Sequence, residues 1–190
     1  MSFFSAPIVE TVRRARAAGR IHHLEATLNG TVNFILSGIA RGAAFQDAVA
    51  AAQRAGFAEE DPSADLGGAD AAAKAAILIH EAFGVDLDPR LVDRQPLDAA
   101  LYQWMMSQGG VWRQVTSIDR DGDAISASIA MVEVALHSPM ARAADEGNAI
   151  RIDGQAGVFE ARGRGAGRIP TVESILADLH DARRAMAARA

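Results

Sequence analysis

Cysteine is absent from this chain of 190 residues, and aromatic side chains make up only 5% of it. Without cysteine there is no disulfide, no thiolate metal site and no cysteine nucleophile. No apolar run approaches the roughly 18 residues that a membrane-spanning helix requires. Basic residues are in the minority, since 19 Lys and Arg stand against 24 Asp and Glu, which gives a net charge of -5. This balance argues against binding to nucleic acid or to an anionic membrane surface.

The rest of the composition is that of an ordinary globular protein. Hydrophobic residues make up 49% and charged residues 23% of the chain, which is close to the average for folded domains. A length of 190 residues suits one domain over residues 1–190, large enough to bury about 70% of its unfolded surface. The first residues, MSFFSAPIVE, lack the basic start and long apolar stretch of a signal peptide. We therefore expect a cytoplasmic location.

Hydrophobic periodicity and the positions of Gly and Pro predict the order of helices and strands. Helices are expected over residues 8–18, 32–41, 45–55, 69–83, 97–108, 140–145 and 171–188. A strand is expected over 21–28, and two hairpins pair 111–118 with 124–136 and 148–152 with 158–162. The segment 85–95 has the polar, Pro-containing composition of a connector. Trp104 is expected to face the core from its helix.

This order of elements predicts an α+β fold. We expect a mixed β-sheet of four or five strands with helices packed on one face. The other face would be an apolar surface available for dimerisation, so a homodimer through that face is expected.

The stretch from Gly56 to Lys74, GFAEEDPSADLGGADAAAK, concentrates carboxylates in a loop that leads into a helix. Asp70 and Lys74 are four residues apart, which places an acid and an amine on one helical face. An apolar run follows Lys74, so its amine would lie against a core, beside carboxylates that tune its protonation. Such a cluster can hold a small zwitterion. From charge alone, the alternative is a solvated acidic loop with an ion pair worth about 0.3–0.5 kcal/mol.

A second polar cluster, Asn29-Gly30-Thr31, marks the turn from the first strand to the next helix. Asn29 or Thr31 can cap that helix, and the free N–H groups at its start can receive the carboxylate of a substrate. The alternative is that both side chains are caps only.

Three ordered blocks resemble the homoserine dehydrogenase family. The acidic stretch is similar to the family signature, which reads roughly G-Y-A-E-x-D-P-x-x-D-x-x-G-x-D-A-x-x-K. Residues 29–36 resemble the block N-G-T-x-N-Y/F-I-L, and residues 163–171 resemble G-x-G-A-G-x-x-P-T. The resemblance covers nearly the whole chain, but only the substrate-binding and dimerisation half of the family.

The resemblance implies reversible hydride transfer between NAD(P)H and L-aspartate 4-semialdehyde, which gives L-homoserine for threonine and methionine biosynthesis. Glu59 and Asp65 match the carboxylates near the ammonium group of this small amino-acid substrate. Asp70 matches the acid that orients the hydroxyl or its water. Lys74 matches the lysine that transfers a proton at the carbinol oxygen or stabilises its charge.

The same resemblance adds three residues to the substrate site. Thr31 matches a threonine at that site, and Gly30 precedes it in the same block. Phe57 stands where the family usually has tyrosine, so the ring is kept while a hydroxyl that could bond the substrate is lost.

NADP or NAD is the cofactor that the family implies, bound by a nucleotide domain absent from this chain. The glycines of 163–167 fit the dinucleotide fingerprint poorly, because Arg168 stands where its last glycine belongs. We expect no cofactor-binding or metal-binding residues here. The chain alone would then be silent with NAD(P)H and would act with a separate nucleotide-binding chain. The alternative is a stand-alone amino-acid-binding domain, or a regulatory or partner subunit, without catalysis.

Overall fold

The computed structural model describes residues 7–164. Its helices are α1 (Ile8–Ala18), α2 (Gly30–Ala40), α3 (Phe45–Arg54), α4 (Ser63–Leu66), α5 (Ala69–Phe83), α6 (Ala99–Gln108) and α7 (Pro139–Arg142), with a 3-10 turn, η1 (Pro89–Leu91). Its strands are β1 (Ile21–Thr27), β2 (Asp93–Arg94), β3 (Trp112–Asp121), β4 (Ala124–Glu133), β5 (Gly147–Gly154) and β6 (Gly157–Arg164). No helix within this part of the chain is both long and apolar enough to cross a membrane.

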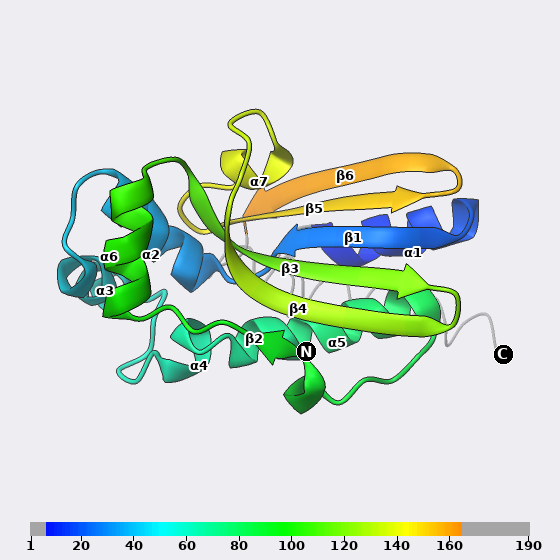
Figure 1. Cartoon of the computed structure of the whole chain (residues 1–190), viewed down its shortest axis with the longest axis horizontal. Helices are drawn as coiled ribbons and strands as arrows, with labels where there is room; N and C mark the ends of the chain where they lie inside the picture. Colours follow the sequence, from blue (N-terminus) through cyan, green and yellow to red (C-terminus); the bar gives the residue numbers. More distant parts are fainter. Residues whose placement is uncertain (1–6, 165–190) are drawn as a thin grey trace, which may run out of the picture.

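The strands form one mixed sheet in the order β2-β4-β3-β1-β5-β6 (Figure 1). β2 pairs with β4 in parallel, and the other neighbours pair antiparallel. The predicted α+β fold with a mixed sheet is therefore confirmed. The sheet has six strands because β2 lies inside the predicted connector. A strand of two residues is too short for the alternation of side chains to reveal it.

Helices α1 and α5 cover one face of the sheet and enclose the main core (Figure 1). A β-bulge between Ile21 and His23 shifts the register of β1 on β5, so both Ile21 and Leu24 join the core and the alternation along β1 is irregular. The largest fully buried side chains of this core are Ile8, Leu24, Leu28, Leu78, Ile79, Ile118, Ile150 and Ile152.

The opposite face of the sheet mixes charged and apolar residues. Its β1, β5 and β6 part is charged, while Val115 of β3 and Ala130 and Val132 of β4 make its other part apolar. On β1, β5 and β6 charged residues alternate with the core positions: Glu25 lies across from Arg151, and Arg151 lies across from Glu160. Arg151 binds Glu160 at 3.1 Å and Asp153 at 2.9 Å. Helix α7 covers only one end of this face, through the buried side chain of Met140. Apolar area therefore remains exposed on this open face, at Val132, which is 40% exposed.

Two further details differ from the sequence expectations. Helix α4 lies in the acidic stretch and was not predicted, since four residues are too few for a helical pattern. Trp104 was expected in the core but is 51% exposed, because it packs edge-on against Trp112 while its neighbour Met105 is buried. The helix predicted over 171–188 lies outside the described residues.

Candidate functional site

The turn between β1 and α2 forms one wall of the candidate site. Asn29 is the N-cap of α2, and its side-chain oxygen accepts a hydrogen bond from the backbone N–H of Val32 at 3.0 Å. Gly30 and Thr31 follow as the first residues of the helix. The Thr31 hydroxyl donates to the carbonyl of Phe57 at 2.7 Å, which ties this turn to the start of the acidic loop.

The acidic loop is held in place mainly through its backbone. Gly56 ends the preceding helix with a φ of 76°, which favours glycine. The Gln53 amide of α3 donates to the carbonyls of Glu59 and Glu60 at 3.3 and 3.0 Å. The Phe57 ring packs on Phe34 of α2 at a centroid distance of 4.8 Å. These contacts leave the Glu59 side chain free of hydrogen-bond partners within the described part of the chain.

Lys74 lies on the third wall of the site, on α5. Its ammonium donates to the carbonyl of Leu28 at 2.9 Å and pairs with a carboxylate oxygen of Asp70 at 2.8 Å. The side chain is only 11% exposed, so this is not the solvated surface pair that charge alone would allow. An ammonium has three N–H donors, and one of them is left for a ligand.

Asp65 is a half-buried carboxyl whose protonation is perturbed. Burial raises its pKa, and the nearby charge of Asp70 raises it further. The amide of Asn29, which donates to Asp65 at 3.0 Å, and the charge of Lys74 oppose these effects without cancelling them. Carboxyl groups with perturbed pKa values in a cleft are often found at functional sites.

These walls enclose a pocket of about 290 Å³. Every predicted site residue lines it: Gly30, Thr31, Phe57, Glu59, Asp65, Asp70 and Lys74. The structure thus brings together residues that are up to 44 positions apart in sequence (74 − 30), while their chemical roles stay predictions. The pocket also includes Asn29, Asp61 and Ala64. The sequence indicated only a helix cap at Asn29. Its position directly before Gly30 and Thr31 is the feature that could have placed it in the pocket.

The volume and charge of this pocket limit what it can bind. Its lining places several carboxylates and one ammonium around a space near the lower end of the range for small-molecule sites. A small zwitterion fits that pattern. A whole nicotinamide dinucleotide does not, because it is too large and its pyrophosphate would face carboxylates. No group of three metal-binding side chains lies close enough together within residues 7–164 to hold an ion.

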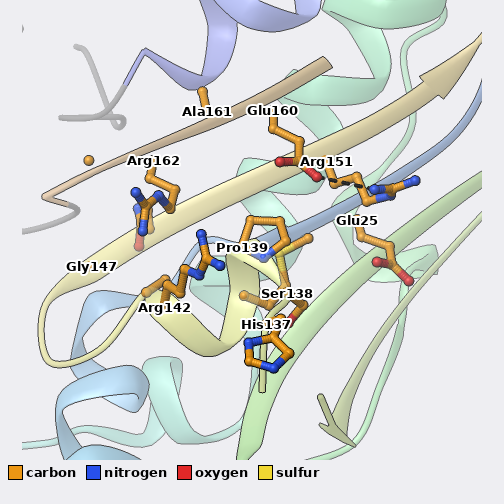
Figure 2. Close-up of a pocket in the computed structure, with 14 residues that line it drawn as sticks. Glu25, His137, Ser138, Pro139, Arg142, Gly147, Arg151, Glu160, Ala161 and Arg162 are labelled. Carbon is orange, nitrogen blue, oxygen red and sulfur yellow. Dashed lines mark hydrogen bonds and ion pairs between the residues drawn. The ribbon is translucent and has the colours of Figure 1, made fainter. Parts of the chain in front are cut away.

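A larger groove of about 860 Å³ lies on the open face, between α7 and strands β5 and β6 (Figure 2). Figure 2 shows the Arg151–Glu160 ion pair on its floor and the side chains of Arg142 and Arg162 at one end. Neither of these two arginines has a hydrogen-bond or ion-pair partner among the described residues. The groove holds no lysine and none of the predicted site residues, so its chemistry differs from that of the acidic pocket.

Together, the fold and the pocket define an α+β domain with a small pocket that is lined by several carboxylates and one ammonium. The family profile for homoserine dehydrogenase matches residues 7–180. The chain therefore belongs to the homoserine dehydrogenase family, as its three sequence blocks indicated.

Several relatives match most of this chain and less of their own length. The homoserine dehydrogenase of Bacillus subtilis is 32% identical over 91% of this chain and 41% of that protein. The NAD(+)-dependent homoserine dehydrogenase of Pseudomonas canavaninivorans is 30% identical over 91% of this chain and 51% of that protein. The crystal structure of a homoserine dehydrogenase from Thiobacillus denitrificans superposes with a TM-score of 0.86, at 31% identity, over 98% of this chain and 44% of that chain. The chain thus spans about half the length of the relatives it matches.

The raised pKa of Asp65 predicts that this carboxylate costs stability. The folded chain binds the Asp65 proton more tightly than the unfolded chain, so stability is lost as pH rises from about 3.8 through the raised pKa. Asp65→Asn removes this cost and keeps an oxygen acceptor for Asn29. We expect the variant to be more stable near pH 7 by on the order of 0.5 kcal/mol, measured by urea unfolding.

The difference between Asp65→Asn and the parent chain should shrink as the pH falls through the raised pKa toward 3.8. Asp61→Asn, which removes the same charge from the same loop, is the matched control and should leave stability within the error of the measurement. A variant less stable than the parent near neutral pH would contradict the assignment.

Proposed function

We propose that this chain is the substrate-binding and catalytic half of an NAD(P)-dependent homoserine dehydrogenase, which interconverts L-homoserine and L-aspartate 4-semialdehyde. One observation carries the proposal. The Lys74 ammonium is anchored on Leu28 and Asp70 at the wall of a small pocket that Glu59 and Asp65 also line.

The pocket supplies complementary groups for both charges of the amino acid. Glu59 and Asp65 accept hydrogen bonds from the ammonium group of homoserine. The backbone N–H groups of Gly30 and Thr31, at the positive end of α2, receive its carboxylate. This arrangement orients the side-chain hydroxyl toward α5.

Lys74 acts at that hydroxyl oxygen. In oxidation the carbinol proton leaves the oxygen, and in reduction a proton returns to it, so a donor within about 3 Å is required in one direction and an acceptor in the other. In reduction the Lys74 ammonium donates its remaining proton to the oxygen and becomes a neutral amine, and in oxidation that neutral amine accepts the carbinol proton and becomes the ammonium again. The positive charge of the ammonium stabilises negative charge on the oxygen. Asp70 orients the lysine and the water beside it.

We propose that the nicotinamide cofactor is held by a separate nucleotide-binding domain or chain. The acidic pocket does not fit a dinucleotide. The NAD(+)-dependent relative from P. canavaninivorans is about twice as long as its segment that matches this chain. The chain alone then binds the substrate without turning it over.

A stand-alone amino-acid-binding or partner subunit would need the same pocket but no proton transfer. The buried Lys74–Asp70 pair favours the catalytic function, because recognition of a zwitterion alone can use a solvated cation. Binding measurements and kinetics separate the two readings.

Homoserine is expected to raise the melting temperature of the chain, because a ligand that binds only the folded state stabilises it. Glu59→Gln should weaken homoserine binding by about tenfold, since a charged acceptor becomes neutral. Calorimetry measures the affinity. Glu133→Gln, an exposed acid on β4, is the control. Binding of NADPH by this chain without homoserine binding would contradict the proposal.

Lys74→Met should lower kcat by about 100-fold or more in an enzyme that joins this chain to a nicotinamide-binding domain. Methionine fills the space of the lysine stem but has no N–H at the carbinol oxygen. Initial rates of homoserine oxidation measure the effect. The homoserine affinity, measured in parallel, should change far less. Near-parental kcat in this variant would exclude the proton-transfer role.

We also propose that the chain forms a homodimer through its open face. Arg142 and Arg162 line the groove of that face and have no partner in residues 7–164, so they can pair with carboxylates across an interface. A second copy with net charge -5 supplies carboxylates in excess.

The double variant Arg142→Glu/Arg162→Glu is expected to shift the chain from dimer toward monomer in sedimentation experiments. Reversal of both charges turns attraction for carboxylates into repulsion. Arg14→Glu/Arg54→Glu, which reverses two exposed charges on α1 and α3, is the matched control. An unchanged dimer, or a monomeric parent chain, would refute this interface.

A further inference from the structure

Asn29 makes more contacts than a helix cap requires. It is 2% exposed, and its side-chain oxygen caps α2 by accepting from Val32 at 3.0 Å. Its amide nitrogen points the other way and donates to the Asp65 carboxylate at 3.0 Å and to the Asp65 carbonyl at 3.4 Å. A serine or aspartate would cap the helix as well, but neither has an N–H group to donate to Asp65.

The cap fixes which end of the amide faces Asp65. The Val32 N–H can only donate, so it requires the amide oxygen on its side. The NH2 group is therefore directed at Asp65, and rotation of the amide would break both contacts at once. The cap of helix α2 thus orients the Asn29 amide so that its NH2 group donates to the Asp65 carboxylate.

The preceding residue acts on the opposite wall of the pocket. The carbonyl of Leu28 accepts the ammonium of Lys74 at 2.9 Å. Two consecutive residues of one turn therefore hold a carboxylate and the lysine, which come from different segments of the chain.

We propose that Asn29 is a positioning residue, which orients Asp65 and keeps it in the ionised form that binds the ammonium group of the substrate. The assignment of a substrate ammonium rests on the proposed function. The control of Asp65 by Asn29 rests only on the contacts above.

The hydrogen bond from Asn29 to Asp65 counteracts two effects that raise the pKa of this carboxyl. Burial raises the pKa of Asp65, and the carboxylate of Asp70 on α5 raises it further. The Asn29 hydrogen bond is the largest effect that lowers it, ahead of the Lys74 charge and the Thr31 hydroxyl. The carboxylates of Glu59 and Asp61 line the same pocket. Without the Asn29 donor, Asp65 would take up a proton at higher pH.

Two substitutions isolate the donor from the cap. Asn29→Ser keeps an oxygen that can cap α2 but removes the NH2 group that donates to Asp65, and its hydroxyl is on a shorter side chain. Asn29→Asp also keeps the cap but places a second carboxylate beside Asp65, which raises its pKa more strongly. The matched control is Asp98→Ser, because Asp98 caps α6 in the same way, by accepting from Leu101 at 2.8 Å, and does not line the pocket.

The first measurement uses the 190-residue chain without ligand. Carbon-detected NMR follows the Asp65 carboxyl as pH is varied. We expect its titration midpoint to move to higher pH in Asn29→Ser and further in Asn29→Asp, and to stay unchanged in Asp98→Ser. A midpoint in Asn29→Ser equal to that of the parent overturns the proposal.

The second measurement is homoserine affinity by calorimetry at two pH values, one at the Asp65 titration midpoint that NMR gives for the parent chain and one well above it. Ammonium binding requires ionised Asp65, so affinity is lost as pH falls through its pKa. Asn29→Ser should weaken binding by about tenfold, with the larger loss at the lower pH. An equal loss at both pH values indicates a merely structural role and contradicts the proposal.

The two measurements also separate this inference from the proposed function. If the parent chain binds no homoserine, the proposed function fails, while the NMR titration still decides whether Asn29 controls Asp65. If homoserine binds but the titration does not respond to Asn29→Ser, only the positioning role fails. Melting temperatures of Asn29→Ser and Asp98→Ser should be similar, which confirms that the fold is kept.

Discussion

The bond between the Lys74 ammonium and the Leu28 carbonyl, at 2.9 Å, is the contact on which the pocket depends. It joins the end of β1 to α5, and these two elements also share the main core. The Asp70 carboxylate completes the surroundings of the ammonium. A cation buried this far needs such partners, because burial of an isolated charge costs several kcal/mol. These two partners leave the third N–H of the ammonium available for another acceptor.

Asp65 differs from Lys74, because its partners do not fully offset the effect of burial on its charge. Burial and the charge of Asp70 raise its pKa, and the groups that lower it only partly offset this rise. Ionisation of Asp65 is therefore less favourable in the folded chain than in the unfolded chain. Such a position is typical of a group selected for binding or catalysis rather than for stability. The pocket thus contains a cation on α5 that is held by two partners and, on α4, a carboxylate whose ionisation is disfavoured by burial.

Much of this architecture could be predicted from local patterns. The helices over 8–18 and 69–83 begin and end at the predicted residues, because apolar spacing and the glycines that follow are signals within one segment. The distribution of charged and apolar residues over the open face could not be predicted this way. Alternation in a strand shows that two faces differ, but a bulge such as that at Ile21 and His23 changes the face to which each residue points.

The sequence by itself determined the class of fold, the family, and the residue types that line the pocket, since each is encoded in short segments with characteristic spacing. Only the tertiary structure decided how those residues act on one another. Leu28 and Lys74, or Asn29 and Asp65, are dozens of positions apart, and no local pattern shows that a carbonyl meets an amine or an amide meets a carboxylate. Their burial and hydrogen bonds, and therefore the protonation of Asp65, exist only once the sheet, α2 and α5 have packed together.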